Sequence, residues 1–296
     1  MSAEPEFAAS PGAQLRFREG FDLSLRPALF ISDVDRTLLT HDHVLLPQVI
    51  SAARSLNDAG IPLFLASARS PTGVGAIARE LRAAQIACCF NGAWVGNIGD
   101  RRSIAEHRIG RETALAAMTA AHELGASPLW FDLDRCFCLL PDVAVARLRT
   151  EVTGDHLGTV DSVGQLSGAP FKILITVAEN RVGSVVRELT ARFGDRLTIA
   201  QSGPALVELT DPGAGKDRAA ALIAARFSAA QANVAAAGDS DNDMGMLRWA
   251  GLAISPANAR PHVQALADVV APSCDEAGLA VAINWIVGGG PNLQPA

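Results

Sequence analysis

Three short apolar runs near the start of the chain, separated by helical patterns, restrict the possible folds most strongly. The runs are residues 28–31, 61–66 and 86–90, and each of them ends in polar residues. Between the runs, apolar residues recur at helical spacing over residues 49–56 and 74–84. Apolar strands that alternate with helices are typical of a parallel sheet with right-handed crossovers. The sequence therefore predicts an α/β fold.

The middle of the chain interrupts this alternation. From residue 94 to residue 208, strand-like pieces and helical stretches mix without a regular order, which predicts a separate α+β unit inserted after the third strand. The alternation then resumes with a helix over 216–227 and a strand over 233–237. We therefore predict a split core over 26–93 and 209–287, an inserted cap over 94–208, a flexible extension over 1–25 and a flexible tail over 288–296.

Length, charge and cysteine content limit the class of protein. The chain has 296 residues, 49% of them hydrophobic, which is enough for one large domain or two moderate ones. Its net charge of −6 gives no reason to expect nucleic acid or an anionic membrane as a partner. The five cysteines show no framework spacing, and the first 20 residues lack the apolar segment of a secretory signal. We expect a cytoplasmic protein with reduced thiols and no membrane span.

Two short pairs of possible metal ligands do not form a recognisable site. Cys136 and Cys138 have neither a second pair at ligand spacing nor a histidine partner, so they are better explained as small buried side chains. His41 and His43 lie in a turn before Pro47, and we favour a role other than metal binding there as well.

Polar groups follow the predicted strands in a fixed order. Ligands of open α/β sheets bind beyond the carboxyl ends of the strands. Ser67 alone could be a helix N-cap, and Lys216 alone could be a solvated lysine in a first helical turn. A cation at a helix N-terminus opposes the helix dipole, so an anion near Lys216 would explain its position. In chain order, the groups are Asp33, Asp35 and Thr37, then Ser67, then Lys216, then Asp239, Asn242 and Asp243.

The acidic residues of this set require a compensating charge. If Asp33, Asp35, Asp239 and Asp243 meet at one sheet edge, they bring up to four negative charges together. At ~4 Å and an effective dielectric constant of about 20, each like-charge pair costs roughly 4 kcal/mol. Mg²⁺ prefers carboxylate, water and phosphate oxygens, and it would offset the repulsion together with Lys216. The sequence therefore predicts a magnesium site.

The order and types of these residues resemble the haloacid dehalogenase-like (HAD) hydrolases. The inserted unit resembles the cap of the Cof-like sugar-phosphatase subfamily. Residues 91–93, 253–259, 267–270 and 275–278 agree with this resemblance, which spans roughly residues 28–287. The resemblance implies a Rossmann-like parallel-sheet core with an inserted α+β cap.

The resemblance also implies catalytic roles. Asp33 matches the nucleophile that forms an aspartyl-phosphate, and Asp35 matches the general acid and base. Asp33, the Asp35 carbonyl and Asp239 match ligands of Mg²⁺, and Asp243 matches a group that tethers the metal through water or Lys216. Lys216 matches the lysine that offsets the negative charge of the site.

Phosphate binding is implied for the remaining residues. Ser67, the amide of Ala68, Lys216 and Asn242 match groups that hold or orient the phosphate. Two positions depart from the usual pattern: Arg36 and Ala68 stand where most relatives have glycine. Both departures add bulk near backbone amides that approach phosphate, and we expect them to modify activity rather than abolish it.

We therefore expect a Mg²⁺-dependent phosphatase of a small phosphorylated metabolite such as a sugar phosphate. Two alternatives stay open: a phosphomutase or phosphotransferase on the same core, and a non-catalytic binding protein that retains the fold. No essential acid is lost, nor is Lys216, and this disfavours the second alternative. The sequence names neither the metabolite nor the oligomeric state. Within the insert we expect ordinary cap surface at the polar or amphipathic residues Trp130, Asp132, Asp134, Arg135 and Lys172.

Overall fold

The computed structural model describes residues 7–9, 15–22 and 25–288. The chain forms two compact units. The first unit contains Met1–Ser67, Ala76–Ala87 and Lys216–Ala296, and the second contains Ala68–Gly75 and Cys88–Gly215. The predicted boundaries at residues 93/94 and 208/209 differ by a few residues from the main divisions observed. Most of the predicted flexible extension, 1–25, and nearly all of the predicted tail, 288–296, lie outside the described residues.

The sheet of the first unit has a parallel centre. In spatial order its strands are β1, β2, β16, β15, β14, β3 and β4, with β5 beside β4. Adjacent strands from β16 to β4 run parallel, whereas β2 pairs antiparallel with both β16 and β1. The part of the predicted extension around β2 thus belongs to a sheet. The strand bounds are β1 Phe7–Ala9, β2 Arg16–Arg18, β3 Leu29–Ser32, β4 Leu63–Ala66, β5 Ile86–Cys89, β14 Val234–Ala237, β15 Leu252–Pro256 and β16 Val269–Ala271.

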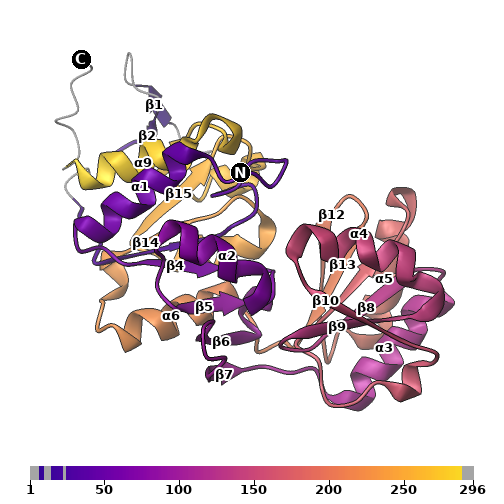
Figure 1. The fold of residues 1–296 in the computed structure, drawn as a ribbon. Helices are drawn as coiled ribbons and strands as arrows, with labels where there is room; N and C mark the ends of the chain where they lie inside the picture. Colours follow the sequence, from indigo (N-terminus) through magenta and orange to yellow (C-terminus); the bar gives the residue numbers. More distant parts are fainter. Residues whose placement is uncertain (1–6, 10–14, 23–24, 289–296) are drawn as a thin grey trace. The chain divides into compact units, whose positions relative to one another are not determined.

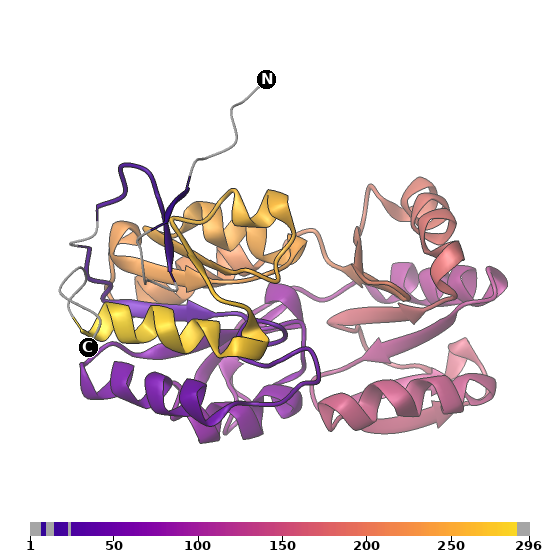
Figure 2. The same ribbon diagram turned by 90° about the horizontal axis from the view of Figure 1, so that it is seen from above.

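Helices cover this sheet. Helices α1 and α9 lie side by side, as both ribbon views show (Figures 1 and 2). Helix α6 packs with α7, which also contacts β14 and β15. From β3 the chain crosses through α1 to β4, and from β14 it crosses through α7 to β15 in the opposite direction along the sheet. Right-handed crossovers therefore place α1 and α7 on opposite faces. The helix bounds are α1 Pro47–Asp58, α2 Pro71–Leu81, α6 Lys216–Arg226, α7 Met244–Trp249, α8 Pro261–Gln264 and α9 Gly278–Val287.

The ends of α1 show how the sequence sets these elements. Pro47 occupies the first turn, where its fixed φ suits a helix and its missing N–H costs no hydrogen bond. Val49, Ala53 and Leu56 are buried against the sheet side of the unit. Gly60 then turns the chain with a φ of +77°, a conformation that side chains disfavour. The helix contains the predicted residues 49–56 and extends two residues beyond them at each end.

The two central strands end side by side. All four residues of β3 and all four of β14 are buried. Their parallel register continues past the strands, because the amide of Asp33 donates to the carbonyl oxygen of Ala237 at 2.9 Å. The loops that follow β3 and β14 therefore start next to each other at one edge of the sheet.

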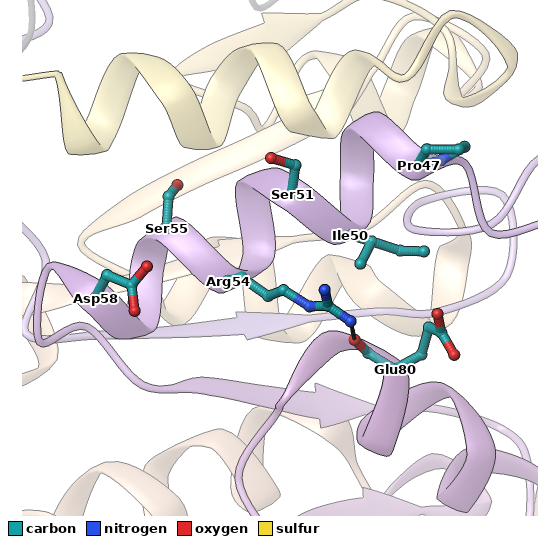
Figure 3. A pocket seen from close by; sticks show the side chains of 7 residues that line it. All are labelled: Pro47, Ile50, Ser51, Arg54, Ser55, Asp58 and Glu80. Atoms are coloured by element: carbon teal, nitrogen blue, oxygen red, sulfur yellow. Dashed lines mark hydrogen bonds between the residues drawn. The ribbon is translucent and has the colours of Figure 1, made fainter.

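An open groove runs along α1 (Figure 3). Arg54 reaches across it and donates from Nη2 to the carbonyl oxygen of Glu80 at 3.1 Å. Its other lining residues belong to Pro47–Asp58, and none of the acidic residues singled out in the sequence lines it. The groove therefore does not form part of the candidate site.

The second unit is built on a separate, mostly antiparallel sheet. Its spatial order is β10-β9-β8-β11-β13-β12, and only β10 and β9 pair in parallel. A hairpin, β6–β7, also belongs to this unit. The predicted insertion of an α+β unit is confirmed, although the sequence did not reveal the hairpin or β10. The strand bounds are β6 Trp94–Asn97, β7 Ser103–Glu106, β8 Ser127–Phe131, β9 Arg135–Leu139, β10 His156–Val160, β11 Lys172–Thr176, β12 Thr198–Gly203 and β13 Leu206–Thr210.

The helices of the second unit are α3 Arg111–Glu123, α4 Val143–Thr153 and α5 Val182–Phe193. Helices α3 and α5 share an apolar core with the sheet, to which they contribute Met118 and Leu189. Trp130 of β8 is 1% exposed within this core, so the expectation of cap surface is wrong for this residue. None of the helices in the described part of the chain is both long and apolar enough to cross a bilayer.

Lys172 and Glu208 form a buried ion pair inside the second unit. Lys172 Nζ lies 3.1 Å from Glu208 Oε1 and also donates to the carbonyl oxygen of Ala68 at 2.7 Å. Asn91 Nδ2 donates to the other carboxylate oxygen, Glu208 Oε2, at 2.6 Å. The side chains of Lys172 and Glu208 are 6% and 8% exposed. The expectation of ordinary cap surface is therefore wrong for Lys172 as well.

Removing one member of this pair should destabilise the protein strongly. We expect Lys172→Met to lower the free energy of unfolding by about 3–5 kcal/mol, because it leaves the Glu208 carboxylate buried without its cation. Urea denaturation followed by circular dichroism measures the change. Arg192 and Glu188 are an exposed pair one helical turn apart, so Arg192→Ala serves as the control and should change stability by about 0.5 kcal/mol or less. Equal effects of the two substitutions would contradict the prediction.

Candidate active site

A buried lysine lies between two aspartates of the first unit. Lys216 Nζ is 2.6 Å from Asp33 Oδ1 and 2.6 Å from Asp243 Oδ1. The side chains of Lys216 and Asp243 are fully buried, and that of Asp33 is 8% exposed. Buried charges persist only when they are paired and hydrogen-bonded. These three residues therefore form one charged unit, which satisfies the expectation of an anion near Lys216.

Three separate elements bring these groups together. Asp33 follows β3, Asp243 lies in a short turn after β14, and Lys216 is the first residue of α6. The close approach of Asp243 to the end of β14 requires a glycine. A Cβ atom on Gly238 would lie 2.4 Å from the Cβ of Asp243, which is too short for any side chain. The neighbouring strand ends thus set the position of the acids.

Asp243 is also held by backbone groups. Its Oδ2 accepts hydrogen bonds from the amides of Asp239 at 3.2 Å and Ser240 at 3.0 Å. Ser240 Oγ donates to Asp239 Oδ1 at 2.8 Å. Ser240 and Asp243 form a capping box around the turn Asp241–Asp243. These bonds fix the positions of both carboxylates after β14.

The charges of the cluster shift one another's ionisation. Burial raises the pKa of Asp33 well above its usual value, and Asp243 raises it further, against the opposing effect of Lys216. Burial, followed by Asp243, raises the pKa of Asp239 to about 6. Burial alone would lower the pKa of Lys216, but Asp243 and Asp33 outweigh it and raise that pKa. The single lysine therefore does not neutralise the acids around it.

The donor set fits a hard divalent cation. Asp33, Asp239 and Asp243 are buried, and each offers a carboxylate oxygen within 4.8 Å of the others. With Lys216 included, the ionised groups carry a formal charge of −2 (three carboxylates and one ammonium). An all-oxygen site of this charge suits Mg²⁺, which keeps several water ligands and uses few carboxylates.

Asp35 occupies a more exposed position and has a histidine partner. Its side chain is 32% exposed, and its Oδ1 lies 2.9 Å from His43 Nδ1. His43 adopts a φ of +60° in the loop after β3, which points to a position under local constraint. The sequence placed His43 in a turn but did not link it to Asp35. No sequence pattern would have found this contact, because it depends on the path of the loop between the two residues.

The residues expected to bind phosphate differ in burial and lie on different elements of the fold. Ser67 is buried at the end of β4, and Asn242 is exposed in the turn Asp241–Asp243. Ala68 belongs to the second unit, where its carbonyl oxygen accepts from Lys172. Within the first unit, the structure thus brings Asp33, Lys216, Asp239 and Asp243 into one cluster and places Ser67 at another strand end of the same sheet.

Arg36 has a backbone conformation that explains why most relatives have glycine at this position. Its φ is +60°, in the left-handed region where glycine has no steric cost. Its carbonyl oxygen accepts a hydrogen bond from Asn258 Nδ2 at 2.9 Å, which holds the backbone in this conformation. The arginine therefore keeps the backbone geometry of the motif at some cost in strain.

A comparison with known families identifies a match over most of the chain. The model of a family described as haloacid dehalogenase-like hydrolase matches residues 30–283. Among curated proteins, one from Bacillus subtilis named "Putative phosphatase YxeH" is 26% identical over 265 residues, which are 88% of this chain and 98% of that protein. Another from the same organism, 5-amino-6-(5-phospho-D-ribitylamino)uracil phosphatase YcsE, is 35% identical, but only over 35% of this chain and 41% of its own length.

Solved structures show the same fold. A haloacid dehalogenase-like hydrolase from Bacteroides thetaiotaomicron superposes with a TM-score of 0.81 at 23% identity and covers 88% of this chain and all of its own. A sugar phosphatase of HAD subclass IIB superposes with a TM-score of 0.74 at 20% identity over 86% of this chain and 97% of its own. The predicted α/β fold with an inserted unit is therefore confirmed.

The raised pKa of Asp239 predicts how the stability of the metal-free protein depends on pH. The usual pKa is 3.8 and that in the folded protein is about 6, so the folded state binds the proton more tightly. Stability from this group is present below pH 3.8 and is lost as the pH rises through about 6, for a total of about 3 kcal/mol. Asp239→Asn lacks this dependence. We expect the stability of the native protein relative to this variant to fall over that range in chelator.

Urea denaturation at several pH values measures this difference, and a divalent cation should reverse it, because the cation stabilises the ionised carboxylate. Asp241→Asn is the control, since Asp241 is exposed and pairs with Arg260 and His262 outside the cluster. A difference between native protein and Asp239→Asn that stays constant with pH would show that Asp239 ionises normally.

Proposed function

Because the chain belongs to the haloacid dehalogenase-like hydrolase family, we propose that it is a Mg²⁺-dependent phosphatase of small phosphorylated metabolites. We infer that the reaction passes through an aspartyl-phosphate on Asp33. The observation that carries the proposal is the buried cluster in which Lys216 bridges Asp33 and Asp243 beside Asp239. The names of its relatives, several of which are called phosphatases, support the same reaction class.

Asp33 is suited to act as the nucleophile. Lys216 holds its Oδ1 at 2.6 Å, which fixes the orientation of the carboxylate at the end of β3. In the first step, a carboxylate oxygen of Asp33 attacks phosphorus, and the bond between phosphorus and the ester oxygen breaks. A carboxylate nucleophile divides a very slow hydrolysis into two faster steps. The positive charge of Lys216 favours the approach of the carboxylate to the anionic phosphate.

Asp35 is suited to move the proton. It is partly exposed, so it can reach both a leaving alkoxide and solvent water. Asp35 gives its proton to the leaving alkoxide in the first step. In the second step it takes a proton from the water that attacks the aspartyl-phosphate, which releases inorganic phosphate and restores Asp33. The contact with His43 Nδ1 orients the Asp35 side chain for both transfers.

Mg²⁺, when bound, would offset negative charge on the phosphate and on the acids. The residues that would hold it are Asp33, the backbone carbonyl of Asp35 and Asp239. Asp243 would tether the site from the side of Lys216, because it is hydrogen-bonded to that lysine and to the amides of Asp239 and Ser240. The rigid bonds around Asp243 keep the acids in place before a cation binds.

The remaining groups would hold the phosphate. Ser67, the amide of Ala68 and Asn242 are assigned to its oxygens, and Lys216 adds a positive charge. The second unit would select the metabolite, and the sugar phosphatase among the structural neighbours makes a sugar phosphate the first class to test. Transfer to water, rather than to a second substrate hydroxyl, distinguishes this proposal from a phosphotransferase and is visible in the products. The cytoplasmic location stays a prediction.

The proposal predicts metal-dependent release of phosphate that requires Asp33. Purified protein with Mg²⁺ should hydrolyse a panel of phosphorylated metabolites and an activated phosphate ester, and excess chelator should abolish the activity. Asp33→Asn should lower kcat by at least ~10⁴-fold, as removal of a nucleophile does. Asp241→Asn, which changes an exposed acid two residues from Asp239, should retain activity. Full activity in chelator, or an active Asp33→Asn protein, would overturn the proposal.

A second prediction separates the roles of the two acids. Asp35→Asn keeps the nucleophile and the backbone carbonyl but loses proton transfer, which is worth typically 10²–10⁴-fold in each step. With an activated ester whose leaving group needs no proton, the first step should survive and the second should stall. Mass spectrometry should then find a phosphorylated protein with the added mass on Asp33. An adduct on another residue, or on the Asp33→Asn protein, would show that the nucleophile is assigned wrongly.

A further inference from the structure

A second group of possible metal ligands lies in the first unit outside the aspartate cluster. His41, Cys274 and Asp275 each offer one ligand atom, and these atoms lie within 4.8 Å of one another. His41 comes from the loop after β3, and Cys274 and Asp275 come from the turn Cys274–Glu276 before α9. Cys274 and Asp275 follow His41 by 233 and 234 positions in the sequence. In the sequence, His41 stands out as a possible metal ligand only together with His43. The spacing of residues therefore did not indicate that His41 lies near Cys274 and Asp275.

The distances within this group are close to those of a zinc coordination shell. A tetrahedral Zn²⁺ with ordinary bond lengths separates a sulfur ligand from a nitrogen or oxygen ligand by ~3.5 Å. Cys274 Sγ lies 3.5 Å from His41 Nδ1 and 3.7 Å from Asp275 Oδ1. His41 Nδ1 lies 2.8 Å from the other carboxylate oxygen, Asp275 Oδ2. For one oxygen to bind the ion together with both other ligands, the carboxylate would turn and its distance from His41 Nδ1 would open to ~3.3 Å.

The two loops are held in this arrangement by bonds that do not use the ligand atom of Cys274 or of His41. The amide of His41 donates to Asp275 Oδ1 at 3.0 Å. The amide of Cys274 donates to Asn258 Oδ1 at 2.8 Å, and Asn258 in turn binds the carbonyl oxygen of Arg36. Because the two loops are already held in place, less conformational entropy is lost when a ligand binds.

Accessibility and charge also suit a cation. The His41 and Asp275 side chains are 44% and 52% exposed, so an ion can reach the group from solvent, while Cys274 is buried beneath them. With a thiolate, a carboxylate and a neutral imidazole, the ligands carry a charge of −2, which a divalent ion balances.

We propose that His41 Nδ1, Cys274 Sγ and a carboxylate oxygen of Asp275 form a Zn²⁺ site that joins the loop after β3 to the turn before α9. Three protein ligands leave the fourth tetrahedral position to water. A thiolate and an imidazole favour zinc over Mg²⁺, whereas the all-carboxylate cluster around Asp33 favours Mg²⁺. The first unit therefore carries two cation sites that differ in ligand chemistry, and this second site is independent of the phosphatase proposal.

Cobalt titration tests the site, because Co²⁺ replaces Zn²⁺ and gives a thiolate-to-metal charge-transfer band in the near ultraviolet. Metal-free, reduced protein in excess Mg²⁺ should develop this band and saturate near one equivalent of Co²⁺, and Zn²⁺ should abolish it. Carboxylates alone give no such band, so binding at the aspartate cluster does not interfere. Binding should also release the thiol proton to the buffer, which calorimetry in two buffers of different ionisation enthalpy detects.

Variants assign the ligands. Cys274→Ser should lose the band, and His41→Ala and Asp275→Asn should weaken Co²⁺ binding at least tenfold. Because His41 and Asp275 are exposed, these two variants decide the matter even if Cys274→Ser is unstable. Two controls should keep the band: Cys138→Ser changes a buried cysteine of the second unit, and His262→Gln breaks a histidine–aspartate pair that has no thiol in its contacts with Asp241. A native protein without the band, or a band that survives Cys274→Ser, would overturn the proposal.

Discussion

The site depends on the two ion pairs that the ammonium group of Lys216 forms with Asp33 and Asp243. This ammonium group is fully buried at the first residue of α6, where the helix dipole opposes a positive charge. Two carboxylates at 2.6 Å offset both the burial and the dipole. Conversely, the buried carboxylates of Asp33 and Asp243 would repel each other without the lysine between them. Each partner is tolerable only because the others are present, so the three residues hold the loop after β3, the turn after β14 and the start of α6 together.

The charged cluster joins the two parts of the first unit that the inserted second unit separates in the sequence. Asp33 precedes the inserted second unit, whereas Lys216 and Asp243 follow it, and Lys216 is the first residue after the return to the first unit. The parallel register of β3 and β14 aligns the two parts, with the amide of Asp33 bound to Ala237. An insertion between them costs little in loop-closure entropy, which grows only slowly with length. The core can therefore accommodate a large inserted unit while its charged cluster stays intact.

The sequence predicts the core well because its signals are local. The strand β14 is a continuous apolar run, and α1 lies between Pro47 and Gly60, so both elements are found within a residue or two. The strand β10 was missed because its five residues, His156–Val160, are only partly buried and contain a glycine, which leaves no clear period. Tertiary contacts were equally invisible. Lys172 looked like a surface residue because its partner Glu208 lies 36 residues away, in a neighbouring strand.

The same limit applied to the site. The order of the acids along the chain revealed the cluster around Lys216, because strand ends meet at one edge of a parallel sheet. The contacts of His43 with Asp35 and of His41 with Cys274 follow instead from the path of a loop, and spacing alone gives no information about them. The family resemblance still pointed to Asp35 as a site residue. It did not point to Cys274, because the possible role of this thiol as a metal ligand depends on the residues that surround it in the fold.

Arg36 connects these two regions. At a φ of +60° a side chain costs roughly 1–2 kcal/mol that glycine would not. Its carbonyl oxygen binds Asn258, and Asn258 also binds the amide of Cys274, so the backbone beside Asp35 is linked through one side chain to the turn that carries the thiol. The Arg36 guanidinium also lowers the pKa of Asp239, against the larger effect of burial, which favours the ionised carboxylate. Any residue would supply the carbonyl oxygen that binds Asn258, whereas only the arginine side chain adds a positive charge near Asp239. The charge at the proposed Mg²⁺ site is therefore the one contribution that glycine could not make.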